Sequence, residues 1–226
     1  MSDGTIIICL FSYSNKAATI PTHNSKARSF EESTLSDSFE QYRVVHLSNV
    51  PKAETKGSLT WQDFATLFSS LESKDKESWC VETDEGTKKR SLTPDSFLAP
   101  KRTKHRAYCS FLVQKDVAAY EKTESALPVV KLPNVDWSYE SALWMFFGRN
   151  PAGSDDLPGR PEHTDSISAD GTWHFQLSGT KKWIIRPTNE LLQHMETTLD
   201  PSEFKSWSLS SRIEITCRQG DVLVIK

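Results

Sequence analysis

Short apolar segments separated by turn residues fill much of the second half of the chain, and they constrain the fold more than any other feature. Each has the length of a β-strand and is too short for a typical helix. Because tight turns separate most of them, they predict a sandwich or barrel and not a βαβ sheet. The fold is therefore expected to be mainly β with peripheral helices. The apolar segments are residues 143–147, 173–177, 181–186, 213–217 and 222–225, and a further, polar strand is expected at residues 163–166.

The N-terminal part is expected to form a tail and then the outer elements of the same domain. Most of residues 1–41 is rich in Ser, Thr, Asn and Glu and lacks periodicity, which predicts a flexible N-terminal tail. One domain is predicted over residues 42–226, with its core in residues 127–226. Residues 61–71 carry apolar side chains at helical spacing after Thr60, a possible cap, and predict a helix that packs against a sheet.

Further elements are expected outside the main series of strands. Apolar, β-branched runs predict strands at residues 43–47 and 79–83. A mixed segment predicts a helix that starts near Asp116. A helical insert is expected at residues 190–196, followed by a short helix with Asp200 as its N-cap.

Composition and charge exclude several classes of protein. The net charge of −3 gives no strong nucleic-acid signal, and no apolar run approaches the length of about 18 residues that a membrane span needs. The four cysteines are far apart and form no CxxC pair, which argues against a zinc site or a disulfide framework. This pattern predicts an intracellular chain with four buried thiols.

Two basic clusters match the pattern of a bipartite nuclear-import signal. Flexible clusters of this kind can be held by the groove of an import receptor, which would be a partner of the chain. The alternative is a solvated, charged loop. The expected location is therefore cytoplasmic or nuclear. The clusters are Lys89 with Arg90 and, after ten intervening residues, Lys101, Arg102 and Lys104.

His163 and Asp165 are the candidate metal ligands. Residues two apart in a strand point to the same face, so this imidazole and this carboxylate can converge on one point. Such a pair supplies two of the three ligands in a 2-His-1-carboxylate site, the set that binds Fe(II) in many oxygenases. A surface His–Asp pair is the alternative.

Lys181 is the candidate for binding an anion. It follows Gly179, which is expected in the turn of a hairpin, and it shares a strand face with Trp183 and Ile185. If that face looks into a barrel, the ammonium lies among apolar walls and needs an anionic partner, which a dicarboxylate ligand would supply. An exposed hairpin lysine is the alternative.

Several motifs, in order, resemble the cupin-like branch of the Jumonji-C (JmjC) oxygenases. The resemblance covers residues 127–226, and the chain from Tyr42 onward is compatible with that family's N-terminal part. The branch includes the asparaginyl hydroxylase of hypoxia-inducible factor and the tRNA wybutosine hydroxylase. The matching pieces are residues 132–133, 143–148, 163–165, 176–181 with Trp183, 185–187 and 219–225.

The resemblance implies a double-stranded β-helix, a jelly-roll barrel with helices outside. It implies that His163 and Asp165 bind Fe(II) and that Lys181 holds the distal carboxylate of the cosubstrate 2-oxoglutarate. His174 and Gln176 would line the cosubstrate pocket. The implied activity is that of a dioxygenase, a hydroxylase or demethylase acting on a protein or RNA substrate.

The third iron ligand of the family is missing from the sequence. The family places a histidine about ten residues after the turn at Gly220 and Asp221, and the sequence stops at Lys226. The double-stranded β-helix is therefore expected to be incomplete at its C-terminus. Two alternatives are a non-catalytic cupin-fold binding module or pseudoenzyme, and a cupin that modifies a sugar or small molecule with another divalent metal.

Overall fold

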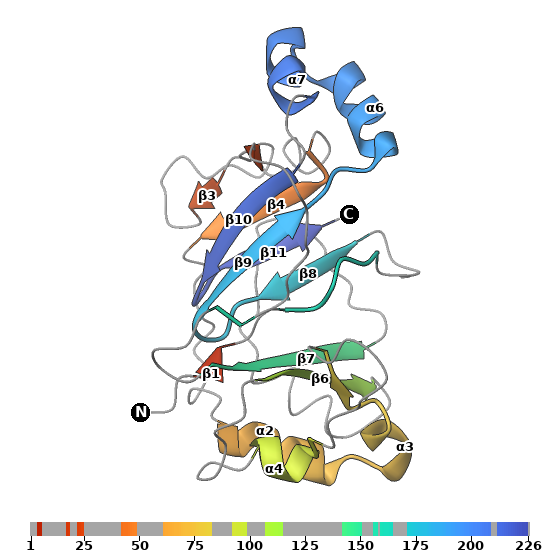
Figure 1. Cartoon of the computed structure of the whole chain (residues 1–226), viewed down its shortest axis with the longest axis vertical. Helices are drawn as coiled ribbons and strands as arrows, with labels where there is room; N and C mark the ends of the chain where they lie inside the picture. The colour runs from red at the N-terminus through yellow and green to blue at the C-terminus, as the bar shows by residue number, and fades with distance from the viewer. Residues whose placement is uncertain are drawn as a thin grey trace.

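Antiparallel strand pairs dominate the described part of the chain, which confirms the predicted mainly-β class (Figure 1). In this computed structural model the strands form three sheets among the described residues. The described helices have at most ten residues, and none has the length and hydropathy that crossing a membrane requires. The structure describes residues 4–5, 17–18, 22–24, 42–48, 61–82, 92–98, 107–114, 142–150, 156–157, 159–164, 171–208 and 212–225.

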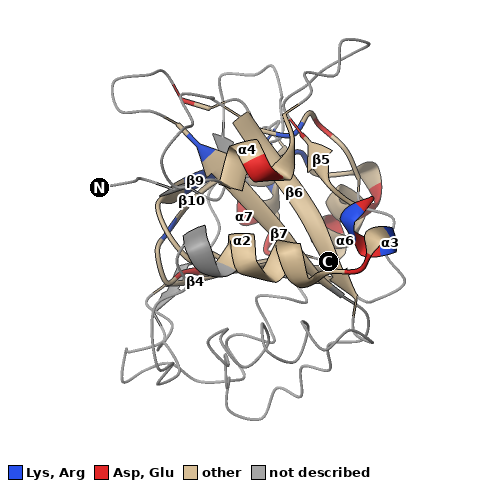
Figure 2. Ribbon diagram, turned by 90° about the horizontal axis from the view of Figure 1, so that it is seen from below, with Lys and Arg blue, Asp and Glu red and all other residues tan. Residues whose placement is uncertain are grey.

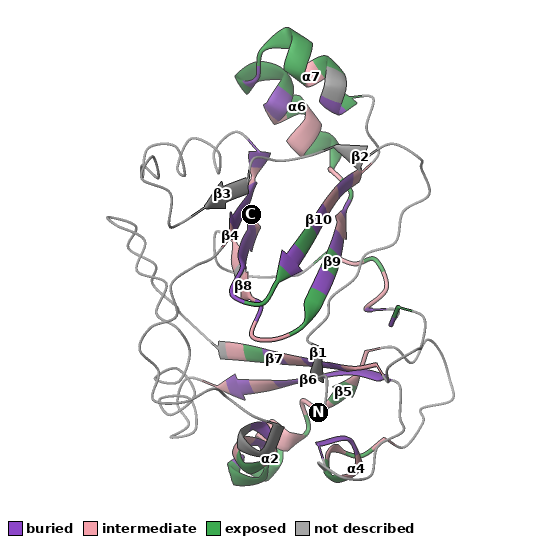
Figure 3. Ribbon diagram, turned by 90° about the vertical axis from the view of Figure 1, so that its left-hand side faces the viewer, coloured by how far each residue is buried: buried purple, intermediate pink, exposed green. Residues whose placement is uncertain are grey.

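Two sheets are built from the strands near the C-terminus. The first has the order β2 (Ala17–Ala18), β10 (Arg212–Arg218) and β9 (Thr180–Ile185), with β9 and β10 antiparallel. Along β9 and β10, buried and exposed residues alternate, so one face of this pair is turned to the core (Figure 3). This is the pattern that the sequence predicts for a half-buried antiparallel pair.

The second of these sheets has four strands. Its order is β3 (Thr22–Asn24), β4 (Val44–Ser48), β11 (Val222–Ile225) and β8 (Thr172–Phe175). Strand β11 is antiparallel to both of its neighbours, and its first three residues are buried. Strands β2 and β3 belong to the predicted N-terminal tail, and they pair with β10 and β4.

The four consecutive strands from β8 to β11 pair in a nested way. The inner two, β9 and β10, form one pair, and the outer two, β8 and β11, form another in the other sheet. The predicted hairpin between residues 173–177 and 181–186 is therefore wrong, although Gly179 does adopt a turn conformation with φ of 67°. Between β8 and β9 the chain crosses from one sheet to the other. At this crossing the backbone of Gln176 bonds to the turn at residues 218–221. Gln176 N donates to Asp221 O, and Gly220 N donates to Gln176 O.

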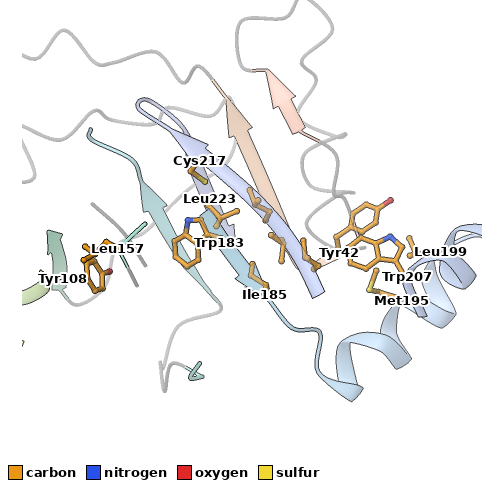
Figure 4. Packing of buried hydrophobic residues seen from close by; sticks show 13 residues of the cluster. Tyr42, Tyr108, Leu157, Trp183, Ile185, Met195, Leu199, Trp207, Cys217 and Leu223 are labelled. Atoms are coloured by element: carbon orange, nitrogen blue, oxygen red, sulfur yellow. The ribbon is translucent and has the colours of Figure 1, made fainter. Parts of the chain in front are cut away.

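A hydrophobic core joins these two sheets (Figure 4). Leu223 on β11 and Ile213 on β10 are fully buried, and Trp183 and Ile185 on β9 join the same cluster. Other members come from the N-terminal part and from the helices after β9. They include Tyr42, Val44, Met195, Leu199 and Trp207.

The third sheet has one face covered by helices. Its order is β1 (Gly4–Thr5), β7 (Ala142–Arg149), β6 (Ala107–Gln114) and β5 (Cys80–Val81). Strand β6 was not predicted, because nearly all of its residues are buried and the alternation typical of a strand is lost. The helix expected near Asp116 lies outside the described residues.

Three helices lie beside this sheet: α2 (Trp61–Ser70), α3 (Ser73–Lys76) and α4 (Pro94–Leu98). Seen from below, α2 and α4 lie across β6 and β7 (Figure 2). A second hydrophobic cluster fills the space between them, as predicted for the helix at residues 61–71. The cluster includes Phe64, Phe68, Leu71, Phe97, Phe111, Val113, Met145 and Phe147.

Two helices follow β9 at one end of the molecule (Figure 1): α6 (Asn189–Thr198) and α7 (Pro201–Ser208). The predicted N-cap of α7 is confirmed, since the Asp200 carboxylate accepts a hydrogen bond from the backbone N of Ser202 at 2.8 Å. Helix α6 begins in the same way, because the Thr188 hydroxyl accepts from the backbone N of Leu191.

Tyr42 ties the start of the domain to α7, and this contact predicts a pH-dependent stability. Its hydroxyl donates to the Glu203 carboxylate, and its ring lies 5.4 Å from that of Trp207. Burial and, second, this hydrogen bond raise the pKa of Tyr42 from 10.0 to about 12. Because the folded state favours the neutral phenol, the contribution is fully present below pH 10 and is lost as the pH rises towards about 12.

The variant Tyr42→Phe isolates this contribution. Urea unfolding should show wild type more stable than the variant below pH 10, with the difference shrinking as the pH rises towards about 12. A difference that stays constant over this range would contradict the assignment.

Candidate functional site

Lys181 lies inside the protein, on the inward face of β9. Its side chain is buried, with 2% of the residue exposed, and it shares that face with Trp183 and Ile185, as the alternation predicts. The ammonium lies 3.1 Å from the centroid of the Trp183 ring, within the range of a cation–π interaction. An exposed hairpin lysine, the alternative considered from the sequence, is therefore excluded.

His174 faces Lys181 from the opposite sheet. Its ring centroid lies 4.6 Å from that of Trp183, and its Nε2 lies 3.2 Å from the Thr172 hydroxyl. Burial and, second, the charge of Lys181 lower the pKa of His174 well below 6.5. His174 is therefore neutral near pH 7 and adds no second cation to the site.

Cys217 lies opposite Lys181 on β10 and is also buried. Burial raises the pKa of the Cys217 thiol to about 12; the nearby Lys181 opposes this rise and Asp221 adds to it. The thiol is therefore protonated near pH 7, and it does not act as an anionic partner for Lys181. The prediction of four buried thiols is wrong for Cys80, which is exposed on the short edge strand β5, and Cys9 lies outside the described residues.

Gln176 directly follows β8 and lies beside the turn between β10 and β11. It is buried, and its side-chain amide donates to the carbonyl of Ser178 at 2.5 Å. Its backbone is bonded to the turn at Gly220 and Asp221. The described contacts of Gln176 therefore fix the crossing between sheets, while its predicted role in lining a cosubstrate pocket stays a prediction.

A buried His–Asp pair lies next to the same turn, and sequence reasoning missed it. Nε2 of His46 on β4 lies 3.1 Å from Oδ2 of Asp221, which also accepts from the backbone N of Arg218 at 2.8 Å. In the sheet register, His46 and His174 are both directly opposite Leu223. The available signal was a polar residue within the apolar run of residues 43–47, where an inward side chain needs a polar partner.

His163 does not lie in a strand, which corrects the expectation for residues 163–166. It belongs to an irregular segment, residues 159–164, in which its Nδ1 lies 2.7 Å from the Pro161 carbonyl. Because a carbonyl only accepts, Nδ1 carries the proton and the lone pair is on Nε2, the nitrogen that a metal would bind. Metal-binding histidines usually donate their other ring N–H to a carbonyl or carboxylate in this way.

The structure leaves the rest of the predicted metal site untested. Asp165 lies outside the described residues, so its convergence with His163 stays a prediction. The described residues contain no group of three His, Cys, Asp or Glu side chains that could hold a metal ion. Of the two predicted ligands, His163 is the one that the structure describes, and its imidazole fits the donor chemistry of an iron ligand. The basic residues of the predicted import signal, Lys89, Arg90, Lys101, Arg102 and Lys104, also lie outside the described residues.

Comparison with known protein families, with curated proteins and with solved structures finds no match to this chain. The functional interpretation therefore depends on the residues themselves.

Proposed function

We propose that this chain is a 2-oxoglutarate-binding domain of the Fe(II)/2-oxoglutarate-dependent oxygenase class, with a jelly-roll core and a protein or RNA substrate. The observation that carries the proposal is the burial of Lys181 beside Trp183 and the neutral His174. An ammonium that lies beside an aromatic ring and a neutral imidazole has the chemistry to bind one carboxylate group.

The strand pairing supports the jelly-roll part of the proposal. In a jelly roll the chain folds back as a long hairpin that is then wrapped across two sheets. Strands β8 to β11 pair in this nested way, with β9–β10 inside β8–β11 and the two pairs in different sheets. The buried side chains of both pairs then face a common core.

The described residues of the site each have a role in this proposal. Lys181 would donate a charge-assisted hydrogen bond to the distal carboxylate of 2-oxoglutarate, and the Trp183 ring would exclude water from that bond. Because burial and the charge of Lys181 lower the pKa of His174, this imidazole stays neutral near pH 7 and does not repel the Lys181 cation. Nε2 of His163 would provide one nitrogen ligand to the metal, together with Asp165. Fe(II), when bound, would supply the oxygen chemistry of the reaction.

Calorimetric titration of 2-oxoglutarate with and without Mn(II), a redox-inert substitute for Fe(II), tests the proposal. We expect Mn(II) to strengthen 2-oxoglutarate binding, since the keto acid can bind the metal while Lys181 holds the other carboxylate. The variant His163→Ala should remove this enhancement. His194→Ala, on the partly exposed helix α6, is the matched control and should keep it.

The other outcomes separate the alternatives. Binding of 2-oxoglutarate that neither Mn(II) nor His163→Ala changes would favour a non-catalytic binding module on this scaffold. If the protein bound no 2-oxoglutarate under either condition, the proposed function would be wrong.

A further inference from the structure

The segment that carries His163 is held on one side by an ion pair whose arginine side chain is 26% exposed and whose glutamate side chain is 8% exposed. Nε of Arg160 lies 3.2 Å from Oε2 of Glu82, the residue directly after β5, and the Arg160 guanidinium lies 5.8 Å from the centroid of the Trp144 ring on β7. Three elements that are far apart in the sequence therefore meet at Arg160. Trp144 itself is 48% exposed, so this contact lies at the surface of the protein.

Glu82 is a fixed anchor for this contact. Its side chain is only 8% exposed, and its other carboxylate oxygen accepts a hydrogen bond of 2.6 Å from the hydroxyl of Ser110 on β6. Its backbone N donates to the carbonyl of Tyr108 at 2.8 Å. The carboxylate therefore keeps one position, and it is buried well enough for loss of the arginine to be costly.

A second ion pair holds the same segment to Arg186, the residue directly after β9, but this pair is exposed. Glu162 pairs with Arg186, and the two side chains are 33% and 60% exposed. Exposed pairs of this kind contribute little to stability. The two ion pairs flank Pro161, whose carbonyl orients the His163 ring. Of the two, the Arg160 contact is the one able to fix the position of this segment.

We propose that Arg160 is a positioning residue that, through Glu82 and Trp144, fixes the 159–164 segment and so the direction of the His163 ring. The functional consequence of this inference rests on the proposed metal-binding role of His163. The positioning itself does not, because it concerns contacts of the protein chain alone.

Mn(II) affinity, measured by the electron paramagnetic resonance signal of the free ion, tests the consequence. Removal of a group that orients a metal ligand typically weakens metal binding by about 10- to 100-fold, and we expect an effect in this range for Arg160→Met. Arg160→Lys, which keeps the charge but loses the planar contact with Trp144, should fall between this variant and wild type. Arg186→Met removes the exposed pair and should stay within about twofold of wild type.

Two further measurements separate positioning from a general loss of structure. The affinity for 2-oxoglutarate without metal should be unchanged in Arg160→Met, since Lys181 lies on a different element. The double variant Arg160→Met with Glu82→Gln avoids a buried unpaired carboxylate, and it should show the same loss of Mn(II) affinity. Equal Mn(II) affinities of Arg160→Met and Arg186→Met would overturn the proposal.

Hydrogen exchange keeps the positioning testable if wild type binds no Mn(II), an outcome that would count against the proposed function only. The backbone amides of Glu162, His163 and Thr164 should then exchange faster in Arg160→Met than in Arg186→Met. Equal exchange rates in these two variants would show that Arg160 does not position the segment.

Discussion

Lys181→Met is expected to weaken 2-oxoglutarate binding by about 10- to 150-fold. A hydrogen bond to a charged group contributes about 1.5–3 kcal/mol, which corresponds to this range of affinities. Methionine keeps the length of the side chain and its apolar contacts with Trp183, so the change removes mainly the charge. Calorimetry should show the loss for 2-oxoglutarate and a much smaller change for 2-oxobutyrate, which lacks the distal carboxylate.

Lys182→Met is the matched control for this variant. Lys182 is the next residue of β9, points to the opposite face, and pairs with Glu214 at 2.7 Å with 53% of its side chain exposed. We expect its 2-oxoglutarate affinity to stay within about twofold of wild type. If Lys181→Met strongly destabilised the fold and left the affinity unchanged, Lys181 would have a structural role and the proposed ligand contact would be wrong.

Asp221→Ala is expected to lower the free energy of unfolding by about 1.5–3 kcal/mol, the usual contribution of a buried hydrogen bond to a charged group. The carboxylate contacts His46 on β4 and accepts from the backbone N of Arg218, so its loss affects both a sheet contact and the β10–β11 turn. Urea unfolding at pH 7 measures the change.

The control for Asp221→Ala is Glu214→Ala on the outer face of β10. Glu214 forms ion pairs with two groups, Lys182 and Arg212, each at 2.7 Å, but about a quarter of its side chain is exposed. Its removal should cost less than about 1 kcal/mol. Similar costs for the two variants would mean that the Asp221 pair contributes no more than a surface ion pair.

Local patterns in the sequence predicted the elements whose cause is local. The alternation in residues 181–185 places Lys181, Trp183 and Ile185 on one face, and the structure confirms this because a strand at the surface of a core buries every second residue. The N-cap at Asp200 was also predictable, since it depends on a hydrogen bond between residues two positions apart.

The errors come from contacts that no local pattern encodes. The partner of β9 is β10 and not β8, because the nested arrangement buries both pairs against one core, while Gly179 is compatible with either connection. Strand β6 is covered on both faces and so lacks alternation. A strand was expected at residues 163–166, where it would place His163 and Asp165 on one face. The described residues His163 and Thr164 instead belong to an irregular segment, which ion pairs hold in place.

The site residues that were missed belong to pairs far apart in the sequence. His46 and Asp221 are separated by 175 positions, and the sequence offers no spacing that would link them. The same holds for Glu82 and Arg160, whose contact depends on how the segment at residues 159–164 lies against the third sheet. Only the three-dimensional structure shows that these side chains contact each other.

The most direct test of the account is the location of bound 2-oxoglutarate. Nuclear Overhauser effects between its two methylene groups and the indole protons of Trp183 measure this, since the ring lies 3.1 Å from the Lys181 ammonium. We expect such effects in wild type and their loss in Lys181→Met. If the bound ligand instead gave effects only to groups on the outer face of β9, around Lys182, the buried lysine would not be the binding site and the central claim would be contradicted.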